Sequence, residues 1–311
     1  MRSPCSFVLL ATALLLPLSG QAQKVPQDGH MIDRLMHPES VARGNGGAFY
    51  AANIGKKLAP SAKDGDGFIA RLAADGTVET LRYLPSASGE AALHAPKGTV
   101  VLDGRLYTAD IDRVVGFDLD TRTKIAGISL EEKGVSFLND VAVLDAQTLL
   151  VSASDQGRIY RVDLSDGSAT ALEAEVPGVN GLTYAADRRA LYAVTFGGAQ
   201  GGTLWTLTLG TGGTVQETSS RTLVEKGRFD GVALRPDGTL LISDWGPEGA
   251  DNPTPALHRV EATGTGAVTT IELPDWKGPA DFVCSATRGC WVPDLPAGMV
   301  RVVRPGERTE P

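Results

Sequence analysis

Short runs of β-forming residues, paired across turns, recur along the whole chain. In each copy a polar residue precedes a first run, and a turn then leads into a second run. Six copies can be read: PESVARGNGGAFYAANI, APKGTVVLDGRLYTADI, FLNDVAVLDAQTLLVSAS, VNGLTYAADRRALYAVTF, FDGVALRPDGTLLISDWG and GPADFVCSATRGCWVPDL. Runs of this kind, bounded by turn residues, are typical of β-strands. Each copy therefore predicts two antiparallel strands joined by a tight turn.

The first five copies are each followed by two further runs with turn residues between them. Examples are GFIARLAADGTVETLRYL, RVVGFDLDTRTKIAGISL and GRIYRVDLSDGSATALEAEV. Each unit is then a four-stranded sheet. The sixth copy ends after GMVRVVR and lacks an outermost strand. We expect residues 30–36 (HMIDRLM), which precede the first copy, to supply it.

A repeat of about 50 residues suits a four-stranded propeller blade and is too long for one coil of a solenoid. One blade cannot bury its own apolar face and must pack on its neighbours. The sequence therefore predicts an all-β, six-bladed β-propeller over residues 23–311 as one domain, closed by an N-terminal strand. A seven-bladed propeller and a β-sandwich are the alternatives, and the number of copies favours neither.

Aligning the copies brings one residue of each into an equivalent position at the start of the first run. We call this set the first ring: Glu39, Lys97, Asn139, Asn180, Asp230 and Ala280. A second set ends the second run of each copy, and we expect it to form a wider ring on the same face with the polar character of a solvated mouth. This second ring is Asn53, Asp110, Ser154, Thr195, Asp244 and Asp294.

Four members of the first ring carry hard oxygen ligands, and none is His, Cys or Met. Such ligands favour Ca²⁺, with Mg²⁺ or Mn²⁺ as alternatives. We therefore predict one divalent cation, held by Glu39, Asn139, Asn180 and Asp230, with positions left open for water and substrate. The competing interpretation is ordinary turn chemistry, since Asn-Gly and Asp-Gly are common turn dipeptides.

Composition and charge narrow the range of partners. The formal charge of −8 argues against nucleic acid or an anionic membrane as a partner. Residues 1–22 have Arg2 ahead of an apolar run, FVLLATALLLPLSG, and small residues before Gln23. This pattern predicts a secretory signal cleaved after Ala22 and a periplasmic or secreted protein. We expect a monomer that acts on a small molecule.

Two cysteines remain after removal of that signal, Cys284 and Cys290, and they flank the turn SATRG. In an oxidising compartment we expect them to form a disulfide across a hairpin. Two buried free thiols are the alternative.

The motifs PES, LND, VNG and FDG, in this order, resemble the senescence-marker-protein (regucalcin) and gluconolactonase family. The paraoxonases and diisopropylfluorophosphatase are more distantly similar. The resemblance covers nearly the whole mature chain and implies a six-bladed propeller with a divalent cation in its channel. It assigns the ligand roles to Glu39, Asn139, Asn180 and Asp230. Paraoxonase-like members carry a His where this chain has Lys97, which puts a base of their type in doubt.

The leading functional hypothesis is a metal-dependent lactonase. The predicted general base is Asp230, with Asp244 as the alternative. We expect Lys97 to orient an anionic substrate or stabilise an oxyanion, or else to form a salt bridge with Glu39 or Asp110. A non-catalytic binding propeller and an arylesterase or phosphotriesterase are the other hypotheses, because fold does not fix function.

Overall fold

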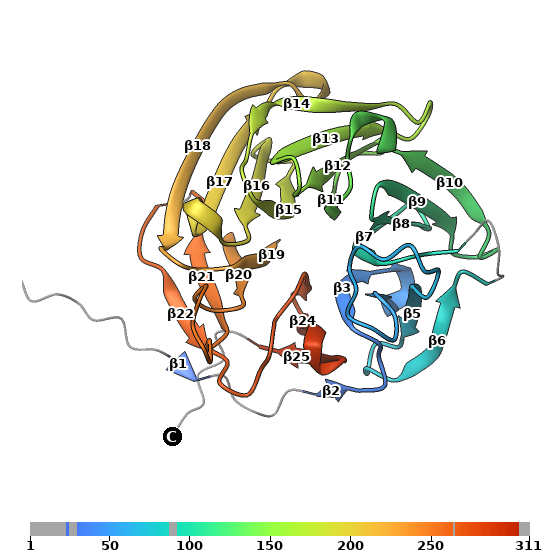
Figure 1. Ribbon diagram of the computed structural model, residues 1–311, viewed down its shortest axis with the longest axis horizontal. Coiled ribbons are helices and arrows are strands. Elements are labelled where there is room, and N and C mark those ends of the chain that lie inside the picture. The colour runs from blue at the N-terminus through green and yellow to red at the C-terminus, as the bar shows by residue number, and fades with distance from the viewer. Residues whose placement is uncertain (1–22, 25–29, 87–91, 264, 305–311) are drawn as a thin grey trace, which may run out of the picture.

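Six β-sheets form a ring around a central axis (Figure 1). The computed structural model describes residues 23–24, 30–86, 92–263 and 265–304. Within each sheet, successive strands of the chain run outward from the axis, except that β1 and β2 from the N-terminal segment form the outer edges of two sheets. The architecture is therefore the six-bladed β-propeller that the repeat predicts.

The blades divide the chain in order. The first three are β3 (Pro38–Arg43), β4 (Phe49–Asn53), β5 (Phe68–Leu72) and β6 (Val78–Leu84); β7 (Pro96–Leu102), β8 (Arg105–Asp110), β9 (Arg113–Asp118) and β10 (Lys124–Ser129); and β11 (Leu138–Asp145), β12 (Thr148–Ala153), β13 (Arg158–Asp163) and β14 (Ala169–Glu175). The fourth and fifth are β15 (Val179–Ala185), β16 (Ala190–Thr195), β17 (Gly202–Leu209) and β18 (Val215–Val224); and β19 (Phe229–Leu234), β20 (Thr239–Asp244), β21 (Ala256–Glu261) and β22 (Thr269–Glu272). The sixth has β23 (Val283–Ser285), β24 (Gly289–Asp294) and β25 (Met299–Val303).

Short 3₁₀ turns are the helical elements in this part of the chain. They are η1 (Asn45–Gly47), η2 (Glu131–Lys133), η3 (Gly198–Gln200), η4 (Thr211–Gly213) and η5 (Leu295–Ala297). Among the described residues no helix is long and apolar enough to cross a membrane. The predicted signal, residues 1–22, lies outside them.

The N-terminal segment closes the ring. Strand β2 (Met31–Ile32) pairs antiparallel with β25 as the outermost strand of the sixth blade, and Ile32 lies opposite Val300. This confirms the prediction for residues 30–36. Strand β1 (Gln23–Lys24) pairs in parallel with β22 and extends the fifth blade, which the repeat did not predict.

Apolar side chains fill the spaces between neighbouring blades. At the closing seam, Phe49 of the first blade stacks on Trp291 of the sixth with ring centroids 3.8 Å apart. Both side chains are buried, together with Ile32 of the closing strand. Complete burial of a large apolar side chain stabilises a fold by about 1.5–3 kcal/mol. The seam is therefore a packed interface of the same kind as the others.

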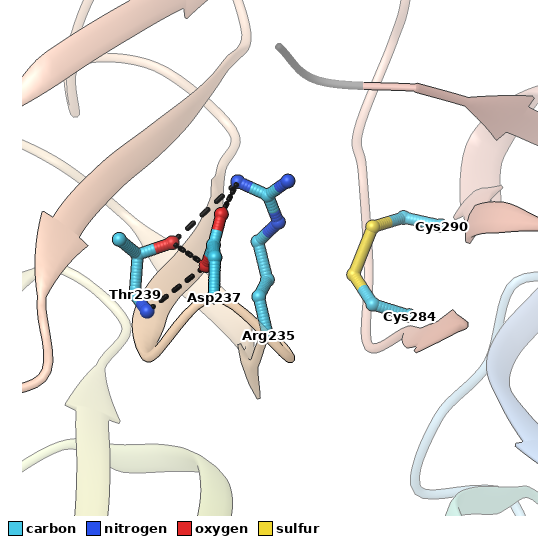
Figure 2. Close-up of a disulfide and its surroundings, with 5 residues drawn as sticks. All are labelled: Arg235, Asp237, Thr239, Cys284 and Cys290. Carbon is cyan, nitrogen blue, oxygen red and sulfur yellow. Dashed lines mark hydrogen bonds and ion pairs between the residues drawn. A yellow bond between two sulfur atoms is a disulfide. The ribbon is translucent and has the colours of Figure 1, made fainter. Parts of the chain in front are cut away.

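The predicted disulfide joins β23 and β24. Cys284 lies directly opposite Cys290 in the sheet, and the two sulfur atoms are 2.01 Å apart (Figure 2).

Candidate functional site

Strand register brings the first ring to one end of the innermost strands. In five blades the residue before a first-ring member pairs with a second-ring member. The pairs are Pro38 with Asn53, Pro96 with Asp110, Val179 with Thr195, Phe229 with Asp244 and Pro279 with Asp294. In the third blade Leu138 pairs with Ala153, so Ala153 is the equivalent residue and our placement of Ser154 was wrong by one position.

Neighbouring blades fix the backbone of the first ring. The hydroxyl of Ser40 donates to the carbonyl oxygen of Lys97 at 3.0 Å, and that of Ser152 to the carbonyl of Asn180 at 2.7 Å. Ser243 donates in the same way to the carbonyl of Ala280 at 3.0 Å. Each bond runs from one blade to the next, so the first-ring side chains start from backbone positions that the ring as a whole determines.

Two glycines allow the innermost strands to approach closely. A Cβ on Gly181 would lie 2.3 Å from the carbonyl oxygen of Asp230, and one on Gly231 would lie 2.6 Å from Cα of Asp281. Both glycines lie inside strands β15 and β19. The alternative interpretation of Asn180-Gly181 and Asp230-Gly231 as turn dipeptides is therefore wrong.

Four first-ring side chains each have a buried oxygen without a hydrogen-bond partner. The atoms are Oε2 of Glu39, Oδ1 of Asn139, Oδ1 of Asn180 and Oδ1 of Asp230. The four residues are between 3% and 6% exposed. A buried polar atom without a partner costs about 1–3 kcal/mol, so one such oxygen in each of four equivalent positions requires an explanation.

The two carboxyl groups among them lie in a negative environment. Burial raises the pKa of Asp230 from 3.8 to about 7, although a hydrogen bond from Trp245 opposes this. Burial, followed by the negative charge of Asp230, raises the pKa of Glu39 well above its ordinary range. Within the described part of the chain, no group of three or more His, Cys, Asp or Glu side chains could hold a metal ion. A cation here would therefore need the asparagine oxygens as well.

The indole of Trp245 orients the Asp230 carboxylate. Its Nε1 donates to Oδ2 of Asp230 at 2.8 Å, which leaves Oδ1 as the unpartnered atom. The indole packs against Phe196 with ring centroids 5.6 Å apart and ring planes at 79°, and it lies against Gly278, where a Cβ would come within 3.0 Å of the ring. These contacts restrict the Trp245 rotamer and so restrict the carboxylate.

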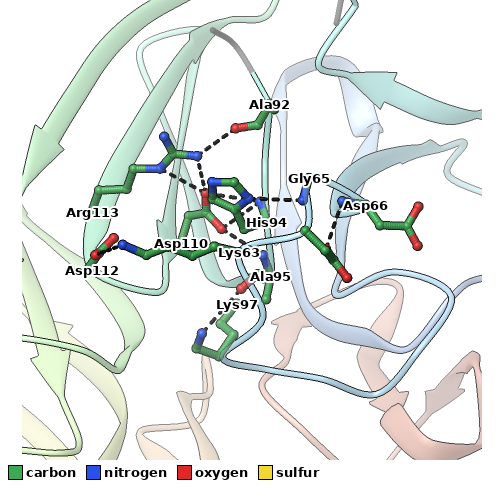
Figure 3. A network of polar contacts seen from close by, with 11 residues as sticks. Lys63, Gly65, Asp66, Ala92, His94, Ala95, Lys97, Asp110, Asp112 and Arg113 are labelled. Atoms are coloured by element: carbon green, nitrogen blue, oxygen red, sulfur yellow. Dashed lines mark hydrogen bonds and ion pairs between the residues drawn. The ribbon is translucent and has the colours of Figure 1, made fainter. Parts of the chain in front are cut away.

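Lys97 is buried beside the other first-ring residues. Its Nζ donates to the carbonyl oxygen of Ala95 at 3.3 Å (Figure 3). It also donates to the carbonyl oxygen of Pro60 at 3.2 Å and lies 4.6 Å from the centroid of the Phe137 ring. Burial lowers the pKa of this ammonium group, and the negative charge of Glu39 opposes the shift.

The salt-bridge alternative for Lys97 does not hold in this structure. Asp110 instead accepts from the guanidinium of Arg113 and from the backbone amides of His94 and Ala95. Among the residues with described positions, no ion pair joins Lys97 to Glu39 or to Asp110.

The predicted solvated mouth is wrong, because the second-ring carboxylates are buried. Each joins neighbouring segments of its own blade by hydrogen bonds, and we call such a carboxylate a clasp. Asp244 accepts from the amides of Arg228 and Gly246 through Oδ1 and contacts Nε2 of His258 at 3.0 Å through Oδ2. Asp294 binds Arg301 in the equivalent way, at 2.9 Å. Each clasp ties the second strand to the third strand and to the loop that enters the blade. Both oxygens of Asp244 are engaged, which favours a structural role over that of a base.

Two buried carboxyl groups next to the first ring were missed from the sequence. Asp140 and Asp281 directly follow first-ring residues, and burial raises the pKa of Asp140 from 3.8 to about 7. The Asp140 carboxylate accepts from the amide of Leu182 at 2.6 Å and so links the third blade to the fourth. The amide of Asp281 donates to the carbonyl of Glu39 at 3.0 Å across the closing seam. The signal was visible in LND and PAD, one position beyond the aligned residue.

An apolar collar lies next to the first ring. Ile54, Ile111, Trp245 and Leu295, each directly after a second-ring residue, pack together with Ala95 and Ala280. Ile111 has φ of 63°, and the amide of Asp112 donates to the carbonyl of Asp110 around it at 2.9 Å. Positive φ is a strained conformation for a β-branched residue. Packing in the collar and this hydrogen bond hold Ile111 in that conformation, and its side chain is 3% exposed.

Beside the collar, the second and third blades border a hollow of about 860 Å³. Ile111, Phe137 and Ser154 contribute to its wall, together with Lys63 from the β4–β5 loop. The ammonium of Lys63 bonds Asp112, and the imidazole Nδ1 of His94 accepts from the amide of Gly65 at 3.0 Å (Figure 3). His94 thus helps to fix this loop, and Phe137, in the wall of the hollow, contacts Lys97 of the first ring.

Solved structures share the fold at low sequence identity. Virginiamycin B lyase from Staphylococcus aureus aligns with a TM-score of 0.60 and 14% identity, over 89% of this chain and 98% of that one. Hydrazine synthase from Kuenenia stuttgartiensis gives a TM-score of 0.60 and 15% identity, over 86% and 76%. A chain of a mitotic checkpoint complex gives 0.59 and 11%, over 97% and 98%. No protein-family model and no curated protein matches the sequence. These similarities show the propeller fold. A function has to be argued from the residues of the site.

Proposed function

We propose that the first ring binds one divalent cation, Ca²⁺ by preference, through Glu39, Asn139, Asn180 and Asp230. The observation that carries the proposal is the unpartnered buried oxygen on each of these four side chains. Two carboxylates and two amides form the hard-oxygen set that Ca²⁺ prefers, and Mg²⁺ or Mn²⁺ are the alternatives. A cation would partner the four oxygens together.

The surrounding charges also support a cation. The carboxyl groups of Glu39, Asp230 and Asp281 are buried. After burial itself, the charge of Asp230 raises the pKa of Glu39, and the charges of Asp140, Glu39 and Asp230 raise the pKa of Asp281. One buried ammonium, that of Lys97, offsets only part of this negative charge. A divalent cation would stabilise the ionised carboxylates at neutral pH.

We propose further that the protein is a metal-dependent hydrolase of the gluconolactonase-like kind, acting on a cyclic ester. A bound cation would polarise the ester carbonyl and stabilise the charge that develops on it. Asp230 is the candidate general base because its Oδ1, which has no partner within the protein, would lie at the cation and next to the positions left open for water and substrate, while Trp245 holds Oδ2. Lys97 is the candidate to stabilise an oxyanion or orient an anionic group. The resemblance in PES, LND, VNG and FDG supports this class.

A binding propeller without catalysis is the second candidate. The apolar collar favours it, because Ile54, Ile111 and Leu295 are buried beside oxygens that are themselves buried. Closed cation sites are generally structural, whereas catalytic sites keep an open position. On the hydrolase hypothesis, the collar must open toward the neighbouring hollow before a substrate can enter.

Cation binding comes first among the tests. Metal-free protein is titrated with Ca²⁺, Mg²⁺ and Mn²⁺ by calorimetry, and we expect about one ion per chain and a higher melting temperature. Asp230→Ala should abolish binding, whereas Asp187→Ala, at an exposed turn, should not change it. Wild-type protein that binds no cation and shows no thermal shift contradicts the whole proposal.

Hydrolysis is tested next on γ- and δ-lactones, aryl esters and phosphotriesters with cation-loaded protein. Asp230→Asn, which keeps a ligand oxygen, should lower the rate by about 10²–10⁴-fold. Asp244→Asn should leave the rate largely unchanged if its carboxylate is only a clasp. Turnover restricted to aryl esters or phosphotriesters would move the assignment to those classes. Cation binding without any turnover would leave the binding propeller.

We also propose export through residues 1–22. Removal of the signal after Ala22 would leave Gln23, the first residue of β1, at the N-terminus. Mass spectrometry of the protein recovered from an exporting host should find this terminus. A retained Met1 to Ala22 segment would contradict cleavage.

A further inference from the structure

A second hollow lies on the face opposite the first ring, between the fifth and sixth blades. Its volume is about 370 Å³. The β19–β20 turn, strand β21, the β23–β24 turn and the end of β25 line it. These segments lie at the far ends of the strands, because the innermost strands run away from the first ring before they turn. The hollow is therefore separate from the proposed cation site.

Positive charge gathers in this hollow although the chain as a whole carries −8. Arg235, Arg259 and Arg304 line it, and one carboxylate, Asp237, accompanies them. Arg235 pairs with Asp237 at 3.0 Å. Three guanidinium groups against one carboxylate leave an excess of positive charge.

Hydrogen bonds within the turn also occupy Asp237. It accepts from the hydroxyl of Thr239 at 2.6 Å and from the amide of Thr239 at 3.0 Å (Figure 2). Burial acts to raise its pKa, but these bonds and the charges of Arg235 and Arg259 outweigh burial and hold the pKa below 3.8. Asp237 is thus ionised at neutral pH, and its single negative charge offsets one of the three guanidinium charges.

A buried hydroxyl in the wall lacks a partner. Ser285, at the end of β23, is 8% exposed, and its Oγ makes no hydrogen bond within the structure. Ser285 is among the residues that line the hollow. A hydroxyl can donate to an oxyanion as a guanidinium can, so Ser285 and the arginines suit the same kind of ligand.

The wall on the side of the sixth blade is held rigidly. The Cys284–Cys290 disulfide joins the two strands of this hairpin and faces the Arg235–Asp237 pair (Figure 2). Gly289 ends the turn with φ of 73°, and a Cβ there would lie 2.6 Å from the carbonyl oxygen of Val303. The hairpin therefore lies directly against β25, beside Arg304. A site held in this way loses little conformational entropy when it binds a ligand.

We propose that this hollow binds a small organic oxyanion, a molecule that carries a phosphate or carboxylate group. Guanidinium groups bind both kinds of oxyanion through paired N–H donors. Arg259 and Arg304 supply the charge, Ser285 supplies a further donor, and Arg235 is held in place by Asp237. The volume leaves room for more of the molecule than the anionic group itself.

Calorimetric titration of metal-free protein with inorganic phosphate and with citrate tests the proposal, with chloride as the reference anion. We expect saturable binding of phosphate, citrate or both, and the stronger ligand identifies the preferred group. Arg259→Gln and Arg304→Gln should each weaken binding about tenfold or more, because each removes a charge-assisted hydrogen bond. Ser285→Ala should weaken it by a smaller factor.

Arg105→Gln is the matched control. Arg105 is an exposed arginine in the second blade, on the same face of the propeller as the hollow but away from it. It should bind like the wild-type protein. Asp230→Ala should also retain anion binding, which separates this site from the channel. The proposal is overturned if the wild-type protein binds neither phosphate nor citrate at anion concentrations up to about 10 mM. The proposal is also overturned if Arg259→Gln and Arg304→Gln bind the anions as tightly as the wild-type protein does. An unchanged melting temperature would show that both variants are folded.

Discussion

At the scale of single residues, the two rings differ in how their oxygens are used. Both oxygens of Asp244 and both of Asp294 have partners on neighbouring strands and loops. Glu39 and Asp230 each keep one buried oxygen without a partner. A carboxylate that accepts several hydrogen bonds from its own blade fixes structure, whereas one with an oxygen left over can bind something else. This difference separates the candidate ligands from the clasps.

Trp245→Phe should weaken cation binding about tenfold. The phenyl ring keeps much of the apolar contact with Phe196 but cannot donate to Oδ2 of Asp230, so the carboxylate loses its orientation. A lost hydrogen bond to a charged group is worth roughly 1.5–3 kcal/mol, which corresponds to a factor of about ten or more. Calorimetric titration with Ca²⁺ measures the change.

Trp276→Phe provides the comparison for that variant. Trp276 packs against Arg301 in the clasp of the sixth blade, with the guanidinium carbon 4.7 Å from the ring centroid. Its substitution should lower stability slightly and leave cation affinity unchanged. Equal cation affinities for Trp245→Phe and the wild-type protein would show that the indole does not position Asp230.

At the scale of elements, the closing strand β2 carries much of the stability of the sixth blade. Without it, the edge of β25 is open and the apolar faces around buried Ile32 lose their cover. A chain that begins at Leu35 should therefore have a free energy of unfolding several kcal/mol lower than that of the mature protein, or fail to fold. Urea denaturation measures this difference.

A chain that begins at Asp28 is the control for the closing strand. It lacks β1 but retains β2, and we expect its denaturation midpoint to lie near that of the mature protein. If the chain that begins at Leu35 is as stable as this control, the ring does not depend on β2.

The strands and their order could be predicted because each copy repeats the same apolar pattern with turn residues between the runs. The position of Glu39, Asn139, Asn180 and Asp230 followed from the same alignment. Contacts between blades could not be predicted, because alignment compares copies and does not show which neighbour a side chain meets. Asp140 was therefore overlooked, and the second ring was taken for a solvated surface when its carboxylates are buried.

Small irregularities were also hidden in the sequence. The register in the third blade pairs Leu138 with Ala153, one residue from the aligned Ser154. Strand β1 adds to the fifth blade in parallel and belongs to no copy of the repeat. Each depends on local strand geometry or on chain outside the repeat, and neither changes the pattern of apolar residues.

At the scale of the whole molecule, the channel combines several buried carboxyl groups with one ammonium. Each blade brings few charges, but closure of the ring gathers Glu39, Asp140, Asp230 and Asp281 near the axis, where burial raises the pKa of each. This arrangement is costly at neutral pH unless positive charge is supplied. The stability of the fold and the occupancy of the first ring should therefore be linked.

The metal-free protein should lose stability as pH rises from about 4 to about 7. The pKa of Asp230 rises on folding from 3.8 to about 7, and so does that of Asp140. The folded chain then binds more protons than the unfolded chain across this window, so the stabilisation is complete below about pH 4 and is lost as pH passes about 7. Surface carboxyls such as Asp66, whose pKa is lowered from 3.8, titrate below this window.

Urea denaturation at a series of pH values, with metal-free and Ca²⁺-saturated protein, measures the effect. Saturating Ca²⁺ should remove most of the decline, because the cation stabilises the ionised carboxylates. A decline that is the same with and without Ca²⁺ would show that the cation does not bind among these groups.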